Sequence, residues 1–284
     1  MSIKTIAIIG AGVMGSDVAL DLACHNLKVI LKDINDDILE KSKERIKETF
    51  RMVQFMKKEF KDISLNSFSH NLHFTTEYKG FEQVDLVIEN ITEEWSVKKR
   101  VYQELKDICT SSPYYAVNTS CISITLVASL LPAPDKVIGV HFMNPVPLKK
   151  MVETIRGFHT SKETEEVIVE FLKSIGKNPI VVNDLPGFVA NRLSHLFMNE
   201  AAFLVQDQVA TPAKIDIIFK QAYGHKMGPL ETADLIGLDT VVKSLEVLYE
   251  SYQDPKFRCC PLLKKMVHAG LLGKKSGKGF YEYK

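Results

Sequence analysis

The chain has 284 residues, of which 45% are hydrophobic and 25% charged, as in ordinary globular proteins of one large or two smaller domains. Its 36 lysines and arginines balance 35 aspartates and glutamates, so the net charge of +1 gives no general reason to expect nucleic acid or a membrane as a partner. No apolar run reaches the roughly 18 residues that a membrane-spanning helix needs.

Short apolar runs alternate with helical patterns through the first two thirds of the chain. Strands are predicted at 6–9, 28–31, 72–74, 84–88, 114–117, 137–140, 151–155 and 179–182, with helices at 13–25, 36–58, 96–108, 123–131 and 161–174. This alternation predicts βαβ units and a Rossmann-type, mostly parallel sheet. The almost continuously apolar strands fit a sheet that is covered on both faces.

The pattern changes at the turn-forming segment 183–187. Beyond it we predict helices at 189–208, 212–223, 231–236, 240–251 and 262–269. The chain is therefore expected to form a Rossmann domain over 1–184 and an all-helical domain over 185–284. The basic glycine-rich segment 273–279 does not have the spacing of a nucleoside-triphosphate loop, and we predict a turn that leads into a terminal strand.

A G-x-G-x-x-G motif joins the first predicted strand to the first helix. The expected contacts to a dinucleotide come from Gly10, Gly12, Val13, Met14 and Gly15. The first glycine permits a tight turn, the second lets the backbone approach a pyrophosphate, and the third allows close packing of helix and strand. This conjunction of strand, loop and helix is much more specific than the motif alone.

Asp33 ends the second predicted strand, at the usual distance from the glycine motif. Its carboxylate can accept hydrogen bonds from a ribose 2′-hydroxyl and would repel a 2′-phosphate. The predicted cofactor is therefore NAD rather than NADP, although the neighbouring Lys32 weakens this preference slightly.

The five cysteines are odd in number and lack zinc-ligand spacing, so no metal site is expected. We interpret them as reduced, mostly buried thiols of a reducing compartment. The strand pattern begins within four residues of the N-terminus and leaves no room for a signal peptide. A cytoplasmic location is the resulting expectation.

His141 follows the predicted strand 137–140, at the carboxyl end where open α/β sheets bind ligands. Glu153 lies in the next apolar run, after the turn-forming segment 144–147, and a hairpin-like reversal would bring it beside His141. A carboxylate next to an imidazole fixes the tautomer and stabilises the imidazolium. Such a pair can serve as the general base that removal of hydride from an alcohol requires.

Two further polar residues are candidates for the same cleft. Ser120 follows the predicted strand 114–117, and Asn191 opens the first helix of the second domain. The alternatives are a structural histidine at 141, a solvated glutamate at 153, a turn serine at 120 and a helix cap at 191.

Taken together, these stretches closely resemble the short-chain L-3-hydroxyacyl-CoA dehydrogenases, including bacterial 3-hydroxybutyryl-CoA dehydrogenases. The resemblance covers nearly the whole chain and is most specific in 8–15, 85–89, 118–120, 141–145, 187–192, 228–230 and 277–281. It implies reversible hydride transfer between NAD and the C3 carbon of a 3-hydroxyacyl thioester bound in the groove between the domains. It also implies a homodimer formed through the helical domain.

The resemblance implies roles for individual residues. His141 would be the acid and base, Glu153 its partner, and Ser120 and Asn191 would hold the substrate oxygen. Further contacts to the cofactor are expected from Glu93, Lys98, Asn118, Ser120 and Asn144.

The chain also departs from the family pattern near the expected substrate site. Cys121 replaces a second serine, Met143 a phenylalanine, and Lys149, Ser194 and His195 replace apolar residues. Polar side chains that line an acyl pocket are costly unless something bonds to them. A short or polar acyl group is one explanation, and the alternative is that Lys149 and His195 point to solvent.

Three alternatives concern the substrate and the activity. The basic residues Arg45, Lys47, Arg51, Lys57, Lys58 and Lys61 suit the phosphates of CoA, an acidic acyl carrier protein, or simply solvent. With a carrier protein the reaction would belong to the biosynthesis of polyketide extender units. Lys149 also allows small free hydroxy acids as substrates. The last alternative is an NAD-binding structural or sensor protein without turnover, against which the intact pair of His141 and Glu153 argues.

Overall fold

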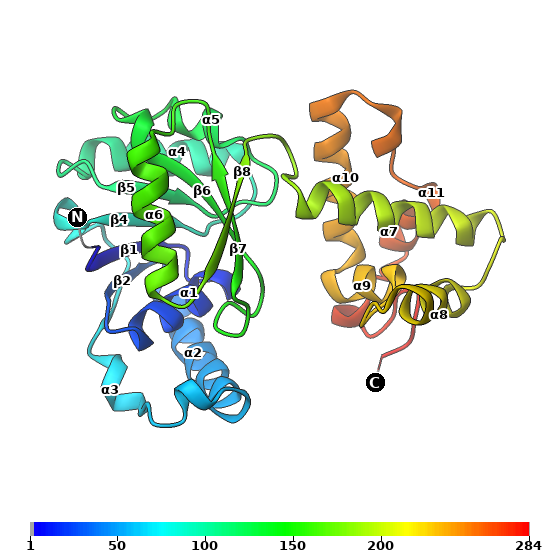
Figure 1. Cartoon of the computed structure of the whole chain (residues 1–284), viewed down its shortest axis with the longest axis horizontal. Helices are drawn as coiled ribbons and strands as arrows, with labels where there is room; N and C mark the ends of the chain where they lie inside the picture. The colour runs from blue at the N-terminus through cyan, green and yellow to red at the C-terminus, as the bar shows by residue number, and fades with distance from the viewer. Residues whose placement is uncertain (1–2, 284) are drawn as a thin grey trace. The chain divides into compact units, whose positions relative to one another are not determined.

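The computed structural model describes residues 3–283, except for the side chain of Glu59. The chain divides into two compact units, Met1–Asp184 and Leu185–Lys284 (Figure 1). Within 3–283, none of the helices combines the length and the apolar character needed to cross a bilayer.

The first unit is built on one mostly parallel sheet of eight strands, in the order β3-β2-β1-β4-β5-β6-β7-β8. The strands are β1 (Thr5–Ile9), β2 (Lys28–Lys32), β3 (Leu72–Thr75), β4 (Leu86–Glu89), β5 (Tyr114–Val117), β6 (Val137–Phe142), β7 (Met151–Arg156) and β8 (Asn178–Asn183). Only the pairing of β6 with β7 is antiparallel among the described strands. The predicted Rossmann-type sheet is confirmed.

Helices cover both faces of this sheet. They are α1 (Val13–Cys24), α2 (Asp36–Met56), α3 (Leu65–Ser69), α4 (Trp95–Ile108), α5 (Ile124–Ala128) and α6 (Lys162–Ser174). Alternate strand residues such as Ile6, Ile88 and Val140 pack into one apolar core with α1, α2 and α6. Figure 1 shows α6 lying across its face of the sheet. The side chains of opposite parity, including His141, therefore point to the face that α4 covers, because successive strand residues alternate between faces.

The register between β6 and β7 sets His141 directly opposite Glu153. Strand β6 runs on to Phe142, so His141 lies inside the strand and not just beyond it, as the sequence suggested. The reversal predicted between these strands is present. The strand is longer because its antiparallel pairing with β7 continues to Phe142, which lies opposite Val152.

The turn between β6 and β7 is held by lysine side chains from elsewhere in the unit. Lys177 donates to the carbonyls of Val146 and Lys149, at 2.6 and 3.1 Å, and forms an ion pair of 2.6 Å with Asp21 of α1. Lys57, just beyond α2, donates to the carbonyl of Pro147 at 2.6 Å. Because Lys177 and Asp21 are both buried, removing either one would leave an unpaired charge in the interior.

The second unit is helical, as predicted. Its helices are α7 (Ala190–Gln206), α8 (Pro212–Tyr223), α9 (Pro229–Ile236), α10 (Leu238–Tyr252) and α11 (Pro261–His268). Short 3-10 helices occur at Lys58–Phe60, Phe81–Gln83, Pro134–Lys136, Pro255–Phe257 and Lys274–Ser276 in the two units. Residues of α7 contribute to two apolar clusters, one with α10 and α11 and one with α8 and α9.

The prediction of a terminal strand is wrong. From Gly273 onward the described chain forms a short 3-10 helix and, in place of a strand, isolated bridges from Lys278 to Gly273 and to Glu282. The backbone N–H groups of Phe280 and Tyr281 instead donate to the buried carboxylate of Asp234, both at 3.0 Å. A side chain thus takes the hydrogen bonds that a neighbouring strand would have supplied.

All five cysteines are free, and four of them are buried. Burial raises the pKa of the Cys24 and Cys259 thiols to about 12, so both stay protonated at neutral pH. The interpretation as reduced structural thiols holds in this structure.

Candidate active site

The glycine loop joins β1 to α1 at the edge of the sheet where the parallel strands end. Gly10 has φ +98°, and a Cβ atom there would lie 2.7 Å from the carbonyl oxygen of Asn90. A Cβ on Gly15 would lie 1.7 Å from the Gly10 oxygen, so neither position accepts a side chain. At Gly12 the Cβ position has nothing within 4 Å, which leaves room for a phosphate close to the backbone.

The start of α1 suits an anion. Its N-cap, Gly12, offers no side chain to cap the helix, and the first turn, which contains Val13 and Met14, has no acidic residue. The amide groups and the positive end of the helix dipole therefore face the open space above Gly12. Loop and helix fit the pyrophosphate of a dinucleotide.

Asp33 follows β2 and is tied to the glycine loop. Its Oδ2 accepts a hydrogen bond of 2.6 Å from the Ala11 N–H, and its Oδ1 accepts one of 2.7 Å from Ile34. The neighbouring Lys32 is buried, with its ammonium group 4.2 Å from the centre of the Tyr78 ring. Because the Lys32 ammonium group faces this ring, it is not expected to weaken the preference for NAD over NADP.

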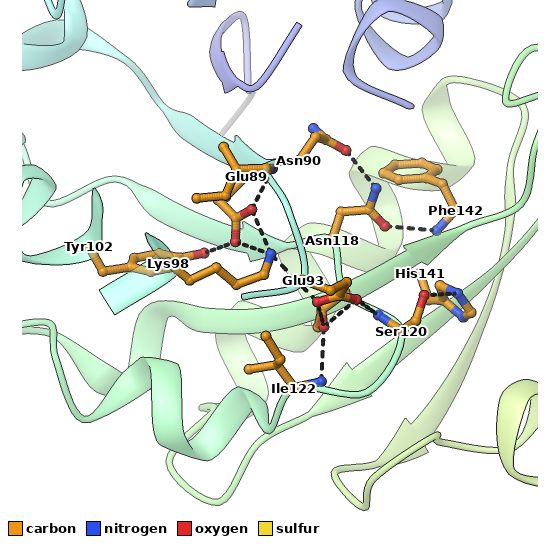
Figure 2. A network of polar contacts seen from close by, with 12 residues as sticks. Glu89, Asn90, Glu93, Lys98, Tyr102, Asn118, Ser120, Ile122, His141 and Phe142 are labelled. Carbon is orange, nitrogen blue, oxygen red and sulfur yellow. Dashed lines mark hydrogen bonds and ion pairs between the residues drawn. The ribbon is translucent and has the colours of Figure 1, made fainter. Parts of the chain in front are cut away.

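A buried ion pair lies where β4 ends. Lys98 of α4 is fully buried and donates to both carboxylate oxygens of Glu89, each at 2.7 Å (Figure 2). The Tyr102 hydroxyl donates to the same carboxylate at 3.3 Å. Burial raises the pKa of Glu89, while the nearby ammonium of Lys98 opposes that shift. With two of its donors on Glu89, Lys98 has one N–H left for the predicted contact to a cofactor, which stays a prediction.

Glu93 links the Lys98 pair to the loop after β5. Its carboxylate accepts hydrogen bonds from the Thr119 hydroxyl, at 2.8 and 2.9 Å, and from the backbone N–H of Ser120. Its Oε2 also lies 3.9 Å from the Lys98 ammonium nitrogen. Glu93 thereby fixes the backbone that carries Ser120, while its side chain remains 35% exposed and can still reach a bound molecule.

His141, Glu153 and Ser120 come together on one face of the sheet. The Nδ1 atom of His141 lies 2.8 Å from the Glu153 Oε2, and its Nε2 lies 3.3 Å from the Ser120 hydroxyl oxygen (Figure 2 shows the latter contact). An ionised carboxylate only accepts hydrogen bonds, so Glu153 places the imidazole proton on Nδ1. Nε2 then carries the lone pair and can take a proton from a hydroxyl group.

The other predicted residues lie at the same strand ends or in the second unit. Asn118 follows β5, and the exposed Asn144 lies in the turn after β6. Asn191 lies in the first turn of α7. His195 is buried, with Nδ1 2.9 Å from the Asn191 carbonyl oxygen, so it does not point to solvent. Lys149 is exposed, as the solvent alternative requires.

Sequence analysis missed Glu89, Asn90 and Thr119. Each is polar and stands at, or just beyond, the end of an apolar strand, which is also the position that singled out Asp33 and Ser120. The same rule, applied to every parallel strand, would have found all three.

Comparison with known proteins matches both units to one family. The profile of the 3-hydroxyacyl-CoA dehydrogenase NAD binding domain matches residues 5–185, and that of the C-terminal domain of the same family matches residues 187–283.

Individual relatives match over nearly their full length. A probable 3-hydroxybutyryl-CoA dehydrogenase of Deinococcus radiodurans is 42% identical over 97% of this chain and 99% of its own. The mitochondrial hydroxyacyl-coenzyme A dehydrogenase of Sus scrofa is 36% identical over 99% of this chain and 92% of its own. The crystal structure of (S)-3-hydroxybutyryl-CoA dehydrogenase from Ralstonia eutropha has a TM-score of 0.93 and 37% identity, with all of both chains covered.

Replacing Asp33 should reduce the discrimination between the two nicotinamide cofactors. In Asp33→Asn the ratio of kcat/KM for NAD to that for NADP should fall about tenfold or more, because the repulsion of a 2′-phosphate is lost. Steady-state kinetics with both cofactors measures the ratio. Lys32→Met is the matched control and should leave the ratio within about twofold. An unchanged ratio in Asp33→Asn would contradict the role of this carboxylate.

Proposed function

This chain belongs to the 3-hydroxyacyl-CoA dehydrogenase family, and we propose that it interconverts short 3-hydroxyacyl-CoA and 3-ketoacyl-CoA thioesters with NAD. The observation that carries the proposal is the pair of His141 and Glu153, with Ser120 beside it, on the sheet whose edge bears the glycine loop. An NAD-binding protein without turnover would have no need to bury a carboxylate against a histidine in this orientation.

Each residue of this group has a distinct role in the proposed reaction. During oxidation, Nε2 of His141 takes the proton of the C3 hydroxyl, and Glu153 stabilises the imidazolium that forms. The Ser120 hydroxyl orients the substrate oxygen, and Asn191 is proposed as a further substrate-binding residue. When bound, NAD supplies the hydride acceptor for the hydrogen on C3. In the reducing direction His141 returns the proton.

We propose NAD contacts for the residues that line the ends of the parallel strands. Gly10, Gly12, Val13, Met14 and Gly15 would hold the pyrophosphate, and Asp33 the adenosine ribose. Glu93, Lys98, Asn118, Ser120 and Asn144 would contact the rest of the cofactor. The open Cβ position of Gly12 and the anchored carboxylate of Asp33 support this assignment.

The relatives favour a short acyl group on CoA over an acyl carrier protein, because their names specify hydroxybutyryl-CoA or hydroxyacyl-CoA. Part of the basic surface on α2 is also occupied within the chain. Arg45 pairs with the buried Asp17 at 3.1 Å, and Lys47 pairs with Glu44 at 2.8 Å. Lys149 is exposed, which weakens the support for a polar acyl pocket.

A cytoplasmic location remains a proposal. The five free thiols support it, since unpaired cysteines are typical of reducing compartments.

A second copy of the chain is the proposed partner of the helical unit. Helix α8 is apolar on more than one side: Ile215 is buried in the unit, whereas Ile218 and Tyr223 are 54% and 69% exposed. Leu193 on α7 is similarly exposed. Large apolar side chains that lie exposed together on a helix are typical of a protein–protein interface, so these side chains support a homodimer.

A substrate panel tests the proposed activity. With NAD, kcat/KM for 3-hydroxybutyryl-CoA should exceed that for free 3-hydroxybutyrate by at least about a hundredfold, because binding energy from the CoA moiety contributes to the transition state. The same acyl group on acyl carrier protein should also be used less efficiently. Equal or better kinetics with the free acid or with the carrier would overturn the choice of substrate.

Removing the base should abolish most of the turnover. His141→Gln should lower kcat by at least about a hundredfold, since general base catalysis typically contributes that much or more. Glu153→Gln should also lower kcat, because an amide does not compel the imidazole proton onto Nδ1. His159→Gln, at an exposed histidine of the same unit, is the control and should retain full activity. Normal turnover in His141→Gln would refute the assignment.

A charge on the exposed side of α8 should break the proposed dimer. Light scattering should give the mass of two chains for the unmodified protein and of one chain for Ile218→Glu, because a carboxylate in an apolar interface must be desolvated. Ser251→Glu, exposed on α10, should remain dimeric. A monomeric unmodified protein would contradict the proposal.

A further inference from the structure

A chain of side-chain amides runs across the ends of three parallel strands. The backbone N–H of Phe142 in β6 donates to Oδ1 of Asn118, at 3.3 Å, and Nδ2 of Asn118 donates to Oδ1 of Asn90, at 2.6 Å (Figure 2). Asn118 follows β5 and Asn90 follows β4. This series of hydrogen bonds therefore leads from Phe142, the residue next to His141, toward the glycine loop.

The direction of these hydrogen bonds is fixed from one end. A backbone N–H can only donate, so the atom of Asn118 that faces Phe142 must be its oxygen. Its NH₂ group then faces Asn90 and must meet the amide oxygen there. Asn90 is left with its own NH₂ group at the far end of this series of hydrogen bonds.

That NH₂ group is buried, and among the described residues no acceptor lies within hydrogen-bond distance of it. A buried donor without a partner is rare in folded proteins and calls for a specific explanation. The other end of the same amide is bonded at 2.6 Å, so rotation of the side chain cannot satisfy both ends at once.

Asn90 lies against the glycine loop. A Cβ on Gly10 would meet the Asn90 carbonyl oxygen at 2.7 Å, and a Cβ on Gly15 would meet the Asn90 Cβ at 3.5 Å. In Figure 2 the amide nitrogen of Asn90 points away from Asn118, toward the blue ribbon of the N-terminal segment. Dinucleotides cross such a sheet at the switch point between β1 and β4, the strands that precede this loop and Asn90.

We infer that Asn90 is a further cofactor-binding residue. Its NH₂ group donates a hydrogen bond to an oxygen of the bound dinucleotide, either in the pyrophosphate or in the second ribose, which ADP and AMP lack. The inference rests on the NAD-binding function of this unit but not on the identity of the acyl substrate. Through Asn118 the same hydrogen bond aligns the backbone next to His141. Occupation of the cofactor site is thereby connected to the strand that carries the base.

Calorimetric titration with ADP-ribose, ADP and AMP tests the inference without turnover. Asn90→Asp keeps the oxygen that Asn118 needs but removes the donor, and it places a negative charge next to the ligand. ADP-ribose should bind more than about tenfold more weakly to this variant and about two- to tenfold more weakly to Asn90→Ala. AMP, which lacks both the pyrophosphate and the second ribose, should bind to both variants as it does to the unmodified protein.

The ADP titration identifies the acceptor. A weakening equal to that of ADP-ribose places the hydrogen bond on the pyrophosphate, and an unchanged affinity for ADP places it on the ribose. Either result supports the inference. Asn178→Asp makes the same chemical change at an exposed position of the same unit and should leave all three affinities unchanged.

Two results would overturn the inference. One is unchanged binding of ADP-ribose to Asn90→Asp. The other is an equal weakening of AMP and ADP-ribose in both variants, which would show general damage to the glycine loop. Failure of the unmodified protein to bind ADP-ribose would instead count against dinucleotide binding, and so against the proposed function as well. Thermal unfolding of each variant establishes that the titrated protein is folded.

Discussion

The site depends on the antiparallel register between β6 and β7. Side chains alternate across a strand, so a slip of one residue would turn Glu153 to the opposite face and leave His141 beside an aliphatic or hydroxyl side chain. With the observed register the carboxylate and the imidazole meet at 2.8 Å on the face that α4 covers. The tautomer of His141, and with it the position of the basic lone pair, follows from this one pairing.

The turn that sets this register is held by Lys177 and Asp21, two charged residues that have no role in the proposed reaction. Lys177 brings three acceptors together: two carbonyls of the turn and the carboxylate of Asp21 on α1. Burying this ammonium group is unfavourable by itself, and burial lowers the pKa of Lys177 while Asp21 opposes the shift. The arrangement ties the turn to the helix that begins at the glycine loop. The glycine loop and the strand that carries His141 are thereby connected through Asp21 and Lys177.

Much of this could be predicted from sequence because it depends on local signals. The period of the apolar residues placed the eight strands, and it placed the glycine motif, Asp33 and His141 at predicted strand ends and Glu153 in the neighbouring strand. What failed depends on contacts that are distant in sequence. The terminal strand was wrong because Asp234 takes the backbone donors of that segment. The burial of Lys98 could not be foreseen, since a lysine in an amphipathic helix ordinarily faces water.

The contrast between local signals and contacts distant in sequence also explains why sequence analysis missed Asn90. A single asparagine after a strand is a common turn residue, and its sequence neighbours do not reveal that its amide is the third member of a chain starting at Phe142. Only the order of the strands brings these residues together. Sequence analysis therefore found the residues whose position alone implies chemistry, and missed those whose function depends on the hydrogen bonds of their neighbours.

Three glutamates of the site each accept hydrogen bonds from neighbouring residues. Glu89 accepts from Lys98, Glu93 from Thr119 and the backbone of Ser120, and Glu153 from His141. Glu89 and Glu153 are buried among their donors, whereas Glu93 remains partly exposed. The groups proposed to hold the substrate oxygen, the Ser120 hydroxyl and Nε2 of His141, would both be neutral when the alcohol binds for oxidation. Such a site suits a substrate that alternates between alcohol and ketone, because neither form carries a charge at the reacting carbon. During oxidation the only charge that develops on the protein is the imidazolium of His141, which Glu153 is proposed to stabilise.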